Sequence, residues 1–228
     1  MPDPRECFRI AKVDSVAAPQ AYQFHAAVSA SDPHIWPRTD AQIQEYVQDR
    51  CLFGAWREST GELVGIVCAI LDESATPAQY EVGGLTVART YRGRGIASVL
   101  VRFAVAHTMA FERPWKATRK PKFAVVAHVH KENPDPRGVL DRIGFVHSKA
   151  MFIPGDVAPP SMKRDSAGNV SGDELKFTAH ALENLSRWFN QEFTGHLRGG
   201  DEVVFDVGEA TLADLQAVLR STSGESPD

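Results

Sequence analysis

The sequence predicts an α/β domain in which a mixed sheet carries helices on both faces. Segments with strand character alternate with segments of helical periodicity along the first 154 residues. Two apolar runs flank Thr60-Gly61, as they do in a β-hairpin. Apolar side chains from Ile96 to Ala106 recur at helical spacing, so a long amphipathic helix begins near Gly95. With 228 residues, 43% of them hydrophobic, the chain can bury one full core and carry an extension.

The predicted elements of the core follow one another without an internal repeat. Gly83-Gly84 interrupt the strand that ends at Val87, which indicates a bulge or the close approach of another backbone. A short helix with proline in its first turn precedes the last strand. The predicted strands are residues 8–13, 52–57, 63–71, 80–87, 123–130 and 145–153, and the predicted helices are residues 19–30, 40–50, 95–111 and 136–143.

The chain after residue 154 has a different composition. Residues 155–172 are rich in Pro, Ser, Asp and Gly and predict a long loop or a wide hairpin tip. A strand over 175–180, a helix reaching 193, a strand over 203–207 and a helix over 211–219 are expected next. We therefore divide the chain into a core (1–154), an extension packed on it (155–220) and a disordered tail (221–228). Three roles for the extension stay open: it covers the active site, forms a dimer interface or completes the sheet.

Composition limits the classes of partner. The net charge of −4 and the pI near 6.1 argue against a general nucleic-acid binder and suit cationic amine substrates. Cys7, Cys51 and Cys68 are an odd number without metal-ligand spacing, so we expect no metal and reduced thiols in a cytoplasmic protein. The N-terminal residues lack signal-peptide character, and the apolar run 63–71 is too short to span a bilayer. No nucleic acid and no membrane are therefore expected among the partners.

A glycine-bearing basic loop stands between the strand that ends at Val87 and the long helix. The N-terminus of a helix has unpaired N–H groups and a partial positive charge, so it attracts anions. Gly93 and Gly95 leave those groups accessible, and Arg92 and Arg94 add full charges. The segment therefore predicts a pyrophosphate site, with a tight basic turn on a solvated helix as the alternative.

Two common nucleotide-binding motifs do not fit this loop. A Walker loop requires Gly-Lys-Ser/Thr, which is absent, and a dinucleotide fingerprint requires a third glycine where Ser98 stands. The pattern Leu85-Thr-Val87 followed by Arg92-Gly-Arg-Gly-Ile-Ala97 instead resembles motif A of the GNAT superfamily of acetyl-CoA-dependent N-acetyltransferases. Two further segments, Ala127-His-Val-His-Lys-Glu-Asn133 and Leu140-Asp-Arg-Ile-Gly-Phe145, resemble the family's fifth strand and the helix end that follows it.

The resemblance, which covers residues 7–153, implies a fold and a co-substrate. The fold is a GNAT-type mixed, mostly antiparallel central sheet, and the co-substrate is acetyl-CoA (coenzyme A). The backbone of Leu85, Thr86 and Val87 is assigned to the acetyl-pantetheine arm, where a free N–H can polarise the thioester carbonyl, and Asn133 to the pantetheine. The basic loop 116–122 contacts the adenosine 3′-phosphate or is simply solvated. The pyrophosphate is assigned to Arg92, Gly93, Arg94, Gly95, Ile96, Ala97 and Ser98.

Glu81 and His128 are the candidate catalytic residues. A primary amine must lose a proton before it attacks a thioester, which costs about 4 kcal/mol near neutral pH, so a base is needed. Glu81 lies four residues before Leu85, where several similar enzymes place a base glutamate; a strand-edge ion pair is the alternative. His128 lies five residues before Asn133, where another branch of the family has a carboxylate, and histidine titrates near neutrality. A structural strand histidine is the alternative for His128.

Leu140 departs from the family's pattern. It stands where the family usually has a tyrosine that protonates the departing CoA thiolate, and leucine has no proton to donate. Water or another residue takes that role, or the protein binds acyl-CoA without turnover.

The loop between the first two helices is expected to bind the acceptor. It contains His34 and Trp36, and an aromatic side chain in a proline-bounded loop can stack on a substrate or contact a cation; a Trp36 that covers the core is the alternative. We expect an N-acetyltransferase whose acceptor is a small-molecule amine. The alternatives are a protein or peptide acetyltransferase and a non-catalytic acyl-CoA-binding protein. GNAT folds are often dimers, so a homodimer is also considered.

Overall fold

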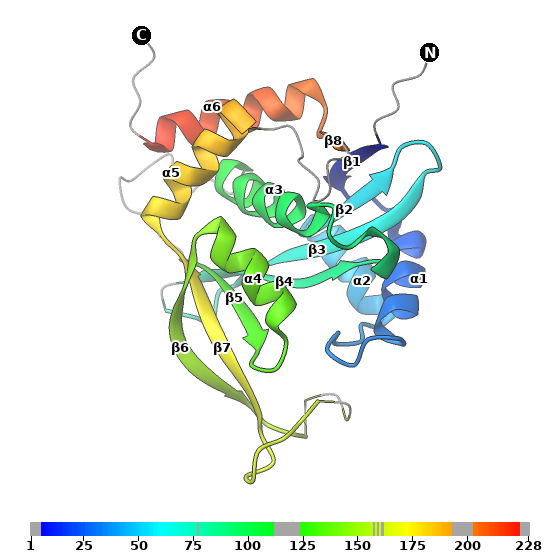
Figure 1. The fold of residues 1–228 in the computed structure, drawn as a ribbon, viewed down its shortest axis with the longest axis vertical. Coiled ribbons are helices and arrows are strands. Elements are labelled where there is room, and N and C mark those ends of the chain that lie inside the picture. The colour runs from blue at the N-terminus through cyan, green and yellow to red at the C-terminus, as the bar shows by residue number, and fades with distance from the viewer. Residues whose placement is uncertain are drawn as a thin grey trace.

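The computed structural model describes residues 6–76, 78–111, 124–156, 158, 160, 162–192 and 203–223. In this part of the chain an eight-stranded sheet has helices packed on both faces (Figure 1). The strand order is β6-β7-β5-β4-β3-β2-β1-β8, and among the described pairs β1–β8 and β4–β5 are parallel while the others are antiparallel. The predicted fold class is confirmed. The strands are β1 (Glu6–Lys12), β2 (Leu52–Arg57), β3 (Glu62–Asp72), β4 (Gln79–Val87), β5 (Ala124–His130), β6 (Phe145–Ile153), β7 (Val170–Phe177) and β8 (Val203–Asp206).

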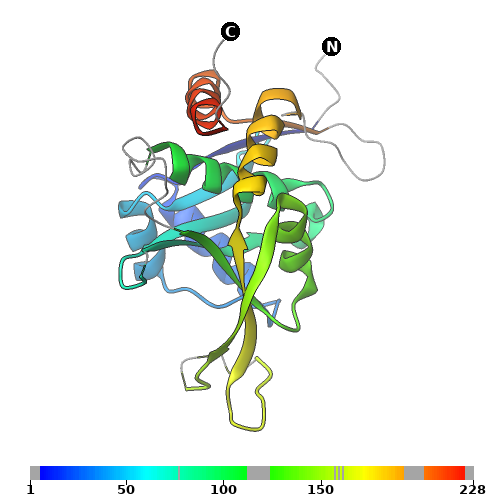
Figure 2. The ribbon, with the colours of Figure 1, turned by 90° about the vertical axis from the view of Figure 1, so that its left-hand side faces the viewer.

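The helices divide between the two faces of the sheet (Figures 1 and 2). One face packs against α3, α4, α5 and α6, and the opposite face packs against α1 and α2. The helices are α1 (Ala18–Ser29), α2 (Asp40–Gln48), α3 (Ile96–Phe111), α4 (Pro134–Ile143), α5 (Ala179–Arg187) and α6 (Glu209–Ser223), with a 3₁₀ turn at Arg89–Tyr91 and a π turn at Trp188–Glu192.

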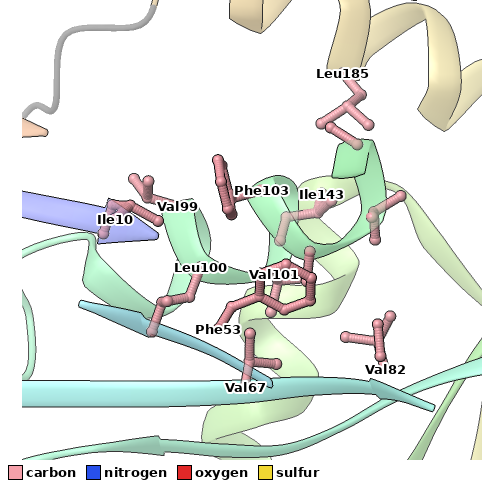
Figure 3. Packing of buried hydrophobic residues seen from close by; sticks show 14 of the residues in the cluster. Ile10, Phe53, Val67, Val82, Val99, Leu100, Val101, Phe103, Ile143 and Leu185 are labelled. Carbon is pink, nitrogen blue, oxygen red and sulfur yellow. The ribbon is translucent and has the colours of Figure 1, made fainter. Parts of the chain in front are cut away.

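The helix α3 is the centre of the larger core. Leu100, Val101 and Phe103 are buried, and they lie above Phe53 and Val67 of the sheet (Figure 3). Each such side chain contributes about 1.5–3 kcal/mol when it leaves water. This packing fixes the direction of α3, so the basic loop at its N-terminus has a defined position beside the end of β4.

A capping box fixes the loop that precedes α2. The hydroxyl of Thr39 accepts a hydrogen bond from the Gln42 N–H at 3.2 Å, and the Gln42 side chain accepts one from the Thr39 N–H at 3.0 Å. Two unpaired N–H groups of the helix start are thereby satisfied. The α1–α2 loop, residues 30–39, therefore joins two helices whose ends are well defined.

The parallel strands β4 and β5 pair over only a short length. Their pairing covers residues 79–81 and 124–126, and beyond Glu81 no β4–β5 pairing is found among the described residues. On its other side, β4 has a register shift against β3 opposite Gly84, which has a φ of 62°. Such a φ suits glycine, which has no Cβ. The sheet is therefore opened between β4 and β5 at the level of the predicted bulge.

The chain after residue 154 enters the sheet at two places. β7 lies between β5 and β6, and β8 pairs with β1 at the opposite edge. β7 starts at Val170 and ends at Phe177, so the strand begins earlier than the predicted 175–180, because its pairing with β6 and β5 extends into the polar segment. α6 continues to Ser223, into the predicted tail. Residues 224–228 and the basic loop 116–122 lie outside the described residues, and the division of the chain at residue 154 stays a prediction.

Candidate active site

One cavity of about 350 Å³ passes through the sheet where β4 and β5 separate. Val101 of α3 and Leu140 of α4 line it from one face, and His25 of α1 and Trp36 of the α1–α2 loop line it from the other. Side chains from opposite faces can share a cavity only where the sheet is open between them. Seven of the predicted site residues are among those that line it: His34, Trp36, Glu81, Leu85, Thr86, His128 and Asn133.

The two candidate catalytic residues form a pair on the α1–α2 face. Nδ1 of His128 lies 3.1 Å from Oε2 of Glu81. The hydrogen bond to Glu81 raises the pKa of His128 above its ordinary value, against the effect of burial, and the charge of Glu81 and a second carboxylate add to the increase. The Glu81 side chain is 39% exposed, whereas that of His128 is 21% exposed. The pair thus has an accessible carboxylate and a basic imidazole next to the cavity.

Glu174 of β7 is the second carboxylate, and the sequence analysis missed it. Its Oε2 lies 3.5 Å from Nε2 of His128 and 3.1 Å from Nζ of Lys149. Burial alone would raise the pKa of Glu174, but hydrogen bonds from Lys149, Ser148 and His128 hold it below its usual range. Only the imidazolium form of His128 can donate to both carboxylates at once. The structure therefore contains a three-membered chain, Glu81–His128–Glu174, in which both carboxylates favour the protonated form of the imidazole.

The sequence analysis missed Glu174 because it did not predict that the strand of Glu174 pairs with β5. Glu174 is directly opposite His128 in the β5–β7 register, and β7 was predicted to begin only at residue 175. Its one signal in the sequence is alternation within Val170–Phe177, which places Gly172 and Glu174 on the face of β7 opposite to that of Asp173 and Leu175. That pattern becomes informative only when the neighbouring strand is known.

The residues assigned to the acetyl-pantetheine arm lie at the bulge of β4. Leu85 and Thr86 line the cavity, whereas Val87 does not. Thr86 is buried, and its hydroxyl donates to the Gly84 carbonyl at 3.1 Å. Because this edge of β4 faces away from β3 and has lost β5, its backbone groups are accessible to a ligand in the gap. The arrangement fits an extended chain that hydrogen-bonds to a strand edge.

The basic loop at the N-terminus of α3 has the backbone shape expected of an anion site. Gly93 and Gly95 have φ values of 83° and 84°, and a Cβ at Gly93 would meet no atom within 4 Å. The side chain of Ile96 is buried, so Ile96 can offer a ligand only its backbone N–H. Ala97 follows it in the first turn of α3 and offers a second backbone N–H. The hydroxyl of Ser98 accepts a hydrogen bond from Arg102, one turn further along α3.

Both arginines of the loop hold carboxylates of other segments. Arg92 pairs with Asp32 of the α1–α2 loop at 2.9 Å and donates to the Val87 carbonyl at 3.2 Å. Arg94 pairs with Glu6 of β1. A phosphate at this loop therefore meets guanidinium groups that already have partners, and Arg92 connects the predicted cofactor loop to the predicted acceptor loop.

Asn133 and Leu140 line the cavity from α4, the former as the N-cap of that helix. Asn133 is the N-cap of α4, its N–H donates to the His130 carbonyl at 2.9 Å, and its side chain makes no capping hydrogen bond. Leu140 is buried and lines the cavity. Among the described residues no tyrosine lines this cavity, so the structure offers no phenol at the position that the family usually provides.

The α1–α2 loop forms the wall opposite β5. The ring of His34 lies 5.9 Å from that of His130, measured between centroids. Trp36 packs against a small cluster that includes Met162 and Val170, so this loop meets the segment between β6 and β7. Trp36 is thus both a cavity residue and a packing residue, and its contact with a substrate stays a prediction.

The comparisons with known proteins agree with this geometry. The family model described as "Acetyltransferase (GNAT) family" matches residues 21–145, more than half of the chain. The chain therefore belongs to the GNAT acetyltransferase family, and it is an acyltransferase by family. No curated protein sequence matches it.

Solved structures with a similar fold include protein acetyltransferases. Arabidopsis thaliana NAA60 in complex with a bisubstrate analogue has a TM-score of 0.55 at 17% identity, covering 75% of this chain and 97% of that chain. The ribosomal-protein-S18-alanine N-acetyltransferase from Escherichia coli has a TM-score of 0.53 at 11% identity, covering 75% and 92%. The NatC complex bound to Gag peptide and CoA has a TM-score of 0.55 at 16% identity, covering 75% and 97%. At these identities the likeness establishes the fold alone.

The described residues form neither a membrane-spanning helix nor a metal-binding cluster. They contain no helix with both the length and the apolar character that a bilayer span requires. No group of three or more His, Cys, Asp or Glu side chains suited to a metal ion occurs among them.

Proposed function

We propose that the protein is an N-acetyltransferase in which a primary amine attacks acetyl-CoA directly in a ternary complex. The observation that carries this proposal is the cavity between β4 and β5, which is lined from both faces of the sheet. Two substrates that enter from opposite faces can meet in such an opening without a covalent enzyme intermediate. Holding them together contributes much of the rate enhancement of a two-substrate reaction.

The chain fits acetyl-CoA at three places. The backbone of Leu85, Thr86 and Val87 offers hydrogen bonds to the acetyl-pantetheine arm, and Asn133 offers an amide side chain beside it. Residues 93–98 offer the open helix N-terminus for the pyrophosphate. Acetyl-CoA supplies an activated acetyl thioester. An N–H at the β4 bulge would stabilise the negative charge that develops on the thioester oxygen.

Glu81 and His128 are proposed to manage the proton. The acceptor ammonium gives a proton to Glu81, which is accessible, and His128 takes that proton when it is neutral. The amine nitrogen then forms a bond to the acetyl carbon, the C–S bond breaks, and the CoA thiolate takes up a proton from water or from His128. Glu174 holds His128 in position from the other side. Since Leu140 cannot donate a proton, this return path replaces the family's usual tyrosine.

A small-molecule acceptor is the favoured class. The α1–α2 loop and the β6–β7 segment meet through Trp36 and Met162, and both of these side chains line the cavity beside Glu81. A cavity of about 350 Å³ is at the lower end of the range for small-ligand sites, roughly 300–1,000 Å³. A protein or peptide acceptor is the second candidate, because the similar structures include a NatC complex bound to a Gag peptide. A cytoplasmic location and a homodimer stay predictions.

The test begins with calorimetric titration of acetyl-CoA and desulfo-CoA. We expect micromolar binding that Gly95→Glu abolishes, since the added carboxylate would occupy the anion site. A panel of amines is then screened for CoA release, and Glu81→Gln should lower kcat by roughly 10²- to 10⁴-fold. Absence of acetyl-CoA binding would refute the cofactor assignment. Binding without CoA release from any amine or peptide would instead identify an acyl-CoA-binding protein.

A further inference from the structure

An arginine without a counter-ion lines the acceptor side of the cavity. Arg38 lies at the end of the α1–α2 loop and is half-buried. Its guanidinium carbon is 5.8 Å from the centroid of the Tyr46 ring, and no carboxylate is within ion-pair distance among the described residues. The other loop arginine near the cavity, Arg92, does have such a partner in Asp32. Arg38 is therefore a cavity-lining positive charge that pairs with no carboxylate of the described residues.

The charge of Arg38 is felt by the groups around it. It opposes protonation of His25, whose pKa is lowered first by burial and then by this charge. A half-buried cation that has lost part of its hydration binds a carboxylate more strongly than an exposed cation does, because both partners are less screened.

His25 adds a second unsatisfied group on the same wall. It is 1% exposed, and its Nε2 lies 3.1 Å from the Trp36 carbonyl, which can only accept a hydrogen bond. Nε2 therefore carries the proton of the neutral ring, and Nδ1 carries a lone pair. That Nδ1 is buried and has no hydrogen-bond partner among the described residues. A buried polar atom without a partner is costly, so His25 adds an unsatisfied acceptor behind the wall that Arg38 also lines.

A negatively charged side chain lines the same cavity. Glu81 lines it and pairs with His128, and no arginine or lysine is within ion-pair distance of Glu81 in the described part of the chain. Arg38 and Glu81 form no ion pair with each other, although both act electrostatically on Cys68 of β3. The cavity is thus lined by an arginine without an ion-pair partner, by a carboxylate and by apolar side chains such as Ile35 and Met151.

We propose that the acceptor is an amine that also carries a carboxylate, bound with its carboxylate at Arg38 and the reacting amine at Glu81. The inference rests on the proposed acetyl transfer and specifies its substrate class as amino acids, rather than simple amines or polyamines. The positive charge at Arg38 repels a second ammonium group, so a diamine of the same length is a poor acceptor.

The experiment compares amino acids with their decarboxylated amines. Ornithine is paired with 1,4-diaminobutane, lysine with 1,5-diaminopentane and 4-aminobutyrate with propylamine, so each pair differs only in the carboxylate. The ratio of kcat/KM within a pair is measured for wild-type protein and for Arg38→Gln. We expect a wild-type preference for at least one amino acid of about 10- to 100-fold, the range for hydrogen bonds to charged groups, and its loss in Arg38→Gln.

A matched control separates binding from structure. Arg9 also places its guanidinium over an aromatic ring, 4.5 Å from the Trp56 centroid, but it does not line the cavity. Arg9→Gln should leave the ratio unchanged. Arg38→Gln should leave the acetyl-CoA dissociation constant unchanged, and a large increase in that constant would overturn the inference by assigning Arg38 to the cofactor.

Other results separate failure of the amino-acid acceptor class from failure of acetyl transfer itself. Turnover of amines without any preference for a carboxylate, or a preference that survives Arg38→Gln, overturns the acceptor class and leaves the acetyltransferase proposal intact. If no amine releases CoA, the proposed function fails, and calorimetry with CoA-saturated protein tests the carboxylate site alone. Binding of an amino acid that Arg38→Gln weakens about 10-fold or more supports the site, and equal binding by both proteins overturns it.

Discussion

The proton on His128 can be measured without knowledge of the acceptor. Its ring nitrogens lie 3.1 Å from a Glu81 oxygen and 3.5 Å from a Glu174 oxygen. We therefore expect the pKa of His128 to lie above the ordinary value of about 6.5. Replacing each carboxylate by its neutral amide, in Glu81→Gln and Glu174→Gln, should lower that pKa by different amounts.

The distances rank the two substitutions. At an effective dielectric constant of about 20, a unit charge 3.5 Å away interacts by roughly 5 kcal/mol, an upper bound for Glu174. Lys149 lies 3.1 Å from the same oxygen, hence no more than about 6.6 Å from the imidazole nitrogen, and its charge cancels roughly half of that interaction. Solvent around the exposed side chains of Lys149 and Glu81 weakens the remaining electrostatic interactions of His128. We expect both substitutions to lower the pKa of His128, and Glu81→Gln to lower it more, because Glu81 is closer and has no lysine partner among the described residues.

The assay is a titration of histidine-labelled protein by NMR, with His128→Gln to identify the resonance. Glu132→Gln is the control, because Glu132 pairs with Lys163 at 2.6 Å and acts on His130 rather than on His128. A wild-type pKa for His128 at or below 6.5 would refute the proposed chain. A larger decrease in Glu174→Gln than in Glu81→Gln would refute the ranking, and with it the role of Lys149.

Three further predictions follow from the same geometry. Gly84→Ala should cost about 1–3 kcal/mol of stability, because its φ is 62°, and it should weaken acetyl-CoA binding. Gly61→Ala is the control: its φ is 68° in the β2–β3 turn, so it should cost a similar amount of stability without affecting binding. Denaturation measures the stability of each variant, and calorimetry measures its binding of acetyl-CoA. Asp32→Asn should free Arg92 for the pyrophosphate and tighten CoA binding by up to about 5-fold, the most that a partly exposed ion pair can oppose; weaker binding would contradict this competition. Because folding raises the pKa of His128, its stabilising effect is complete below the unfolded pKa of about 6.5 and is lost as the pH rises through the folded-state value. The stability lost in His128→Gln should therefore be larger near pH 5.5 than near pH 8.5, and an unchanged or opposite dependence in urea denaturation would count against the raised pKa.

Local signals in the sequence were sufficient for most of the core. Helical spacing after Gly95 predicted α3, and alternating or continuous apolar runs predicted β1 to β6, because both depend on neighbours within a few residues. The glycine pair 83–84 predicted a bulge in β4, and the register shift and the positive φ of Gly84 are found there. The motif around Arg92 predicted the family through a short contiguous pattern, which the family model confirms.

Sequence reasoning was weakest where strands distant along the chain become neighbours. The order of β5, β7 and β6 depends on pairing across the loop of residues 154–169, and no local pattern specifies which edge a strand joins. Glu174 was missed for that reason, although His128 and Glu81 were each identified from their own motifs. The missing counter-ion of Arg38 and the unpaired Nδ1 of His25 could not be read from the sequence either.

The sequence by itself determined the family and the elements around the β4 bulge, and it predicted an anion site in the loop before α3, because each depends on residues close together in the chain. The tertiary structure alone decided that His128 contacts the carboxylates of both Glu81 and Glu174. It also decided that Arg38 lines the same cavity as Glu81 without an ion-pair partner among the described residues. Charge interactions fall off with distance through space, and side chains from α1, β4, β5 and β7 come within that range only after the sheet has assembled.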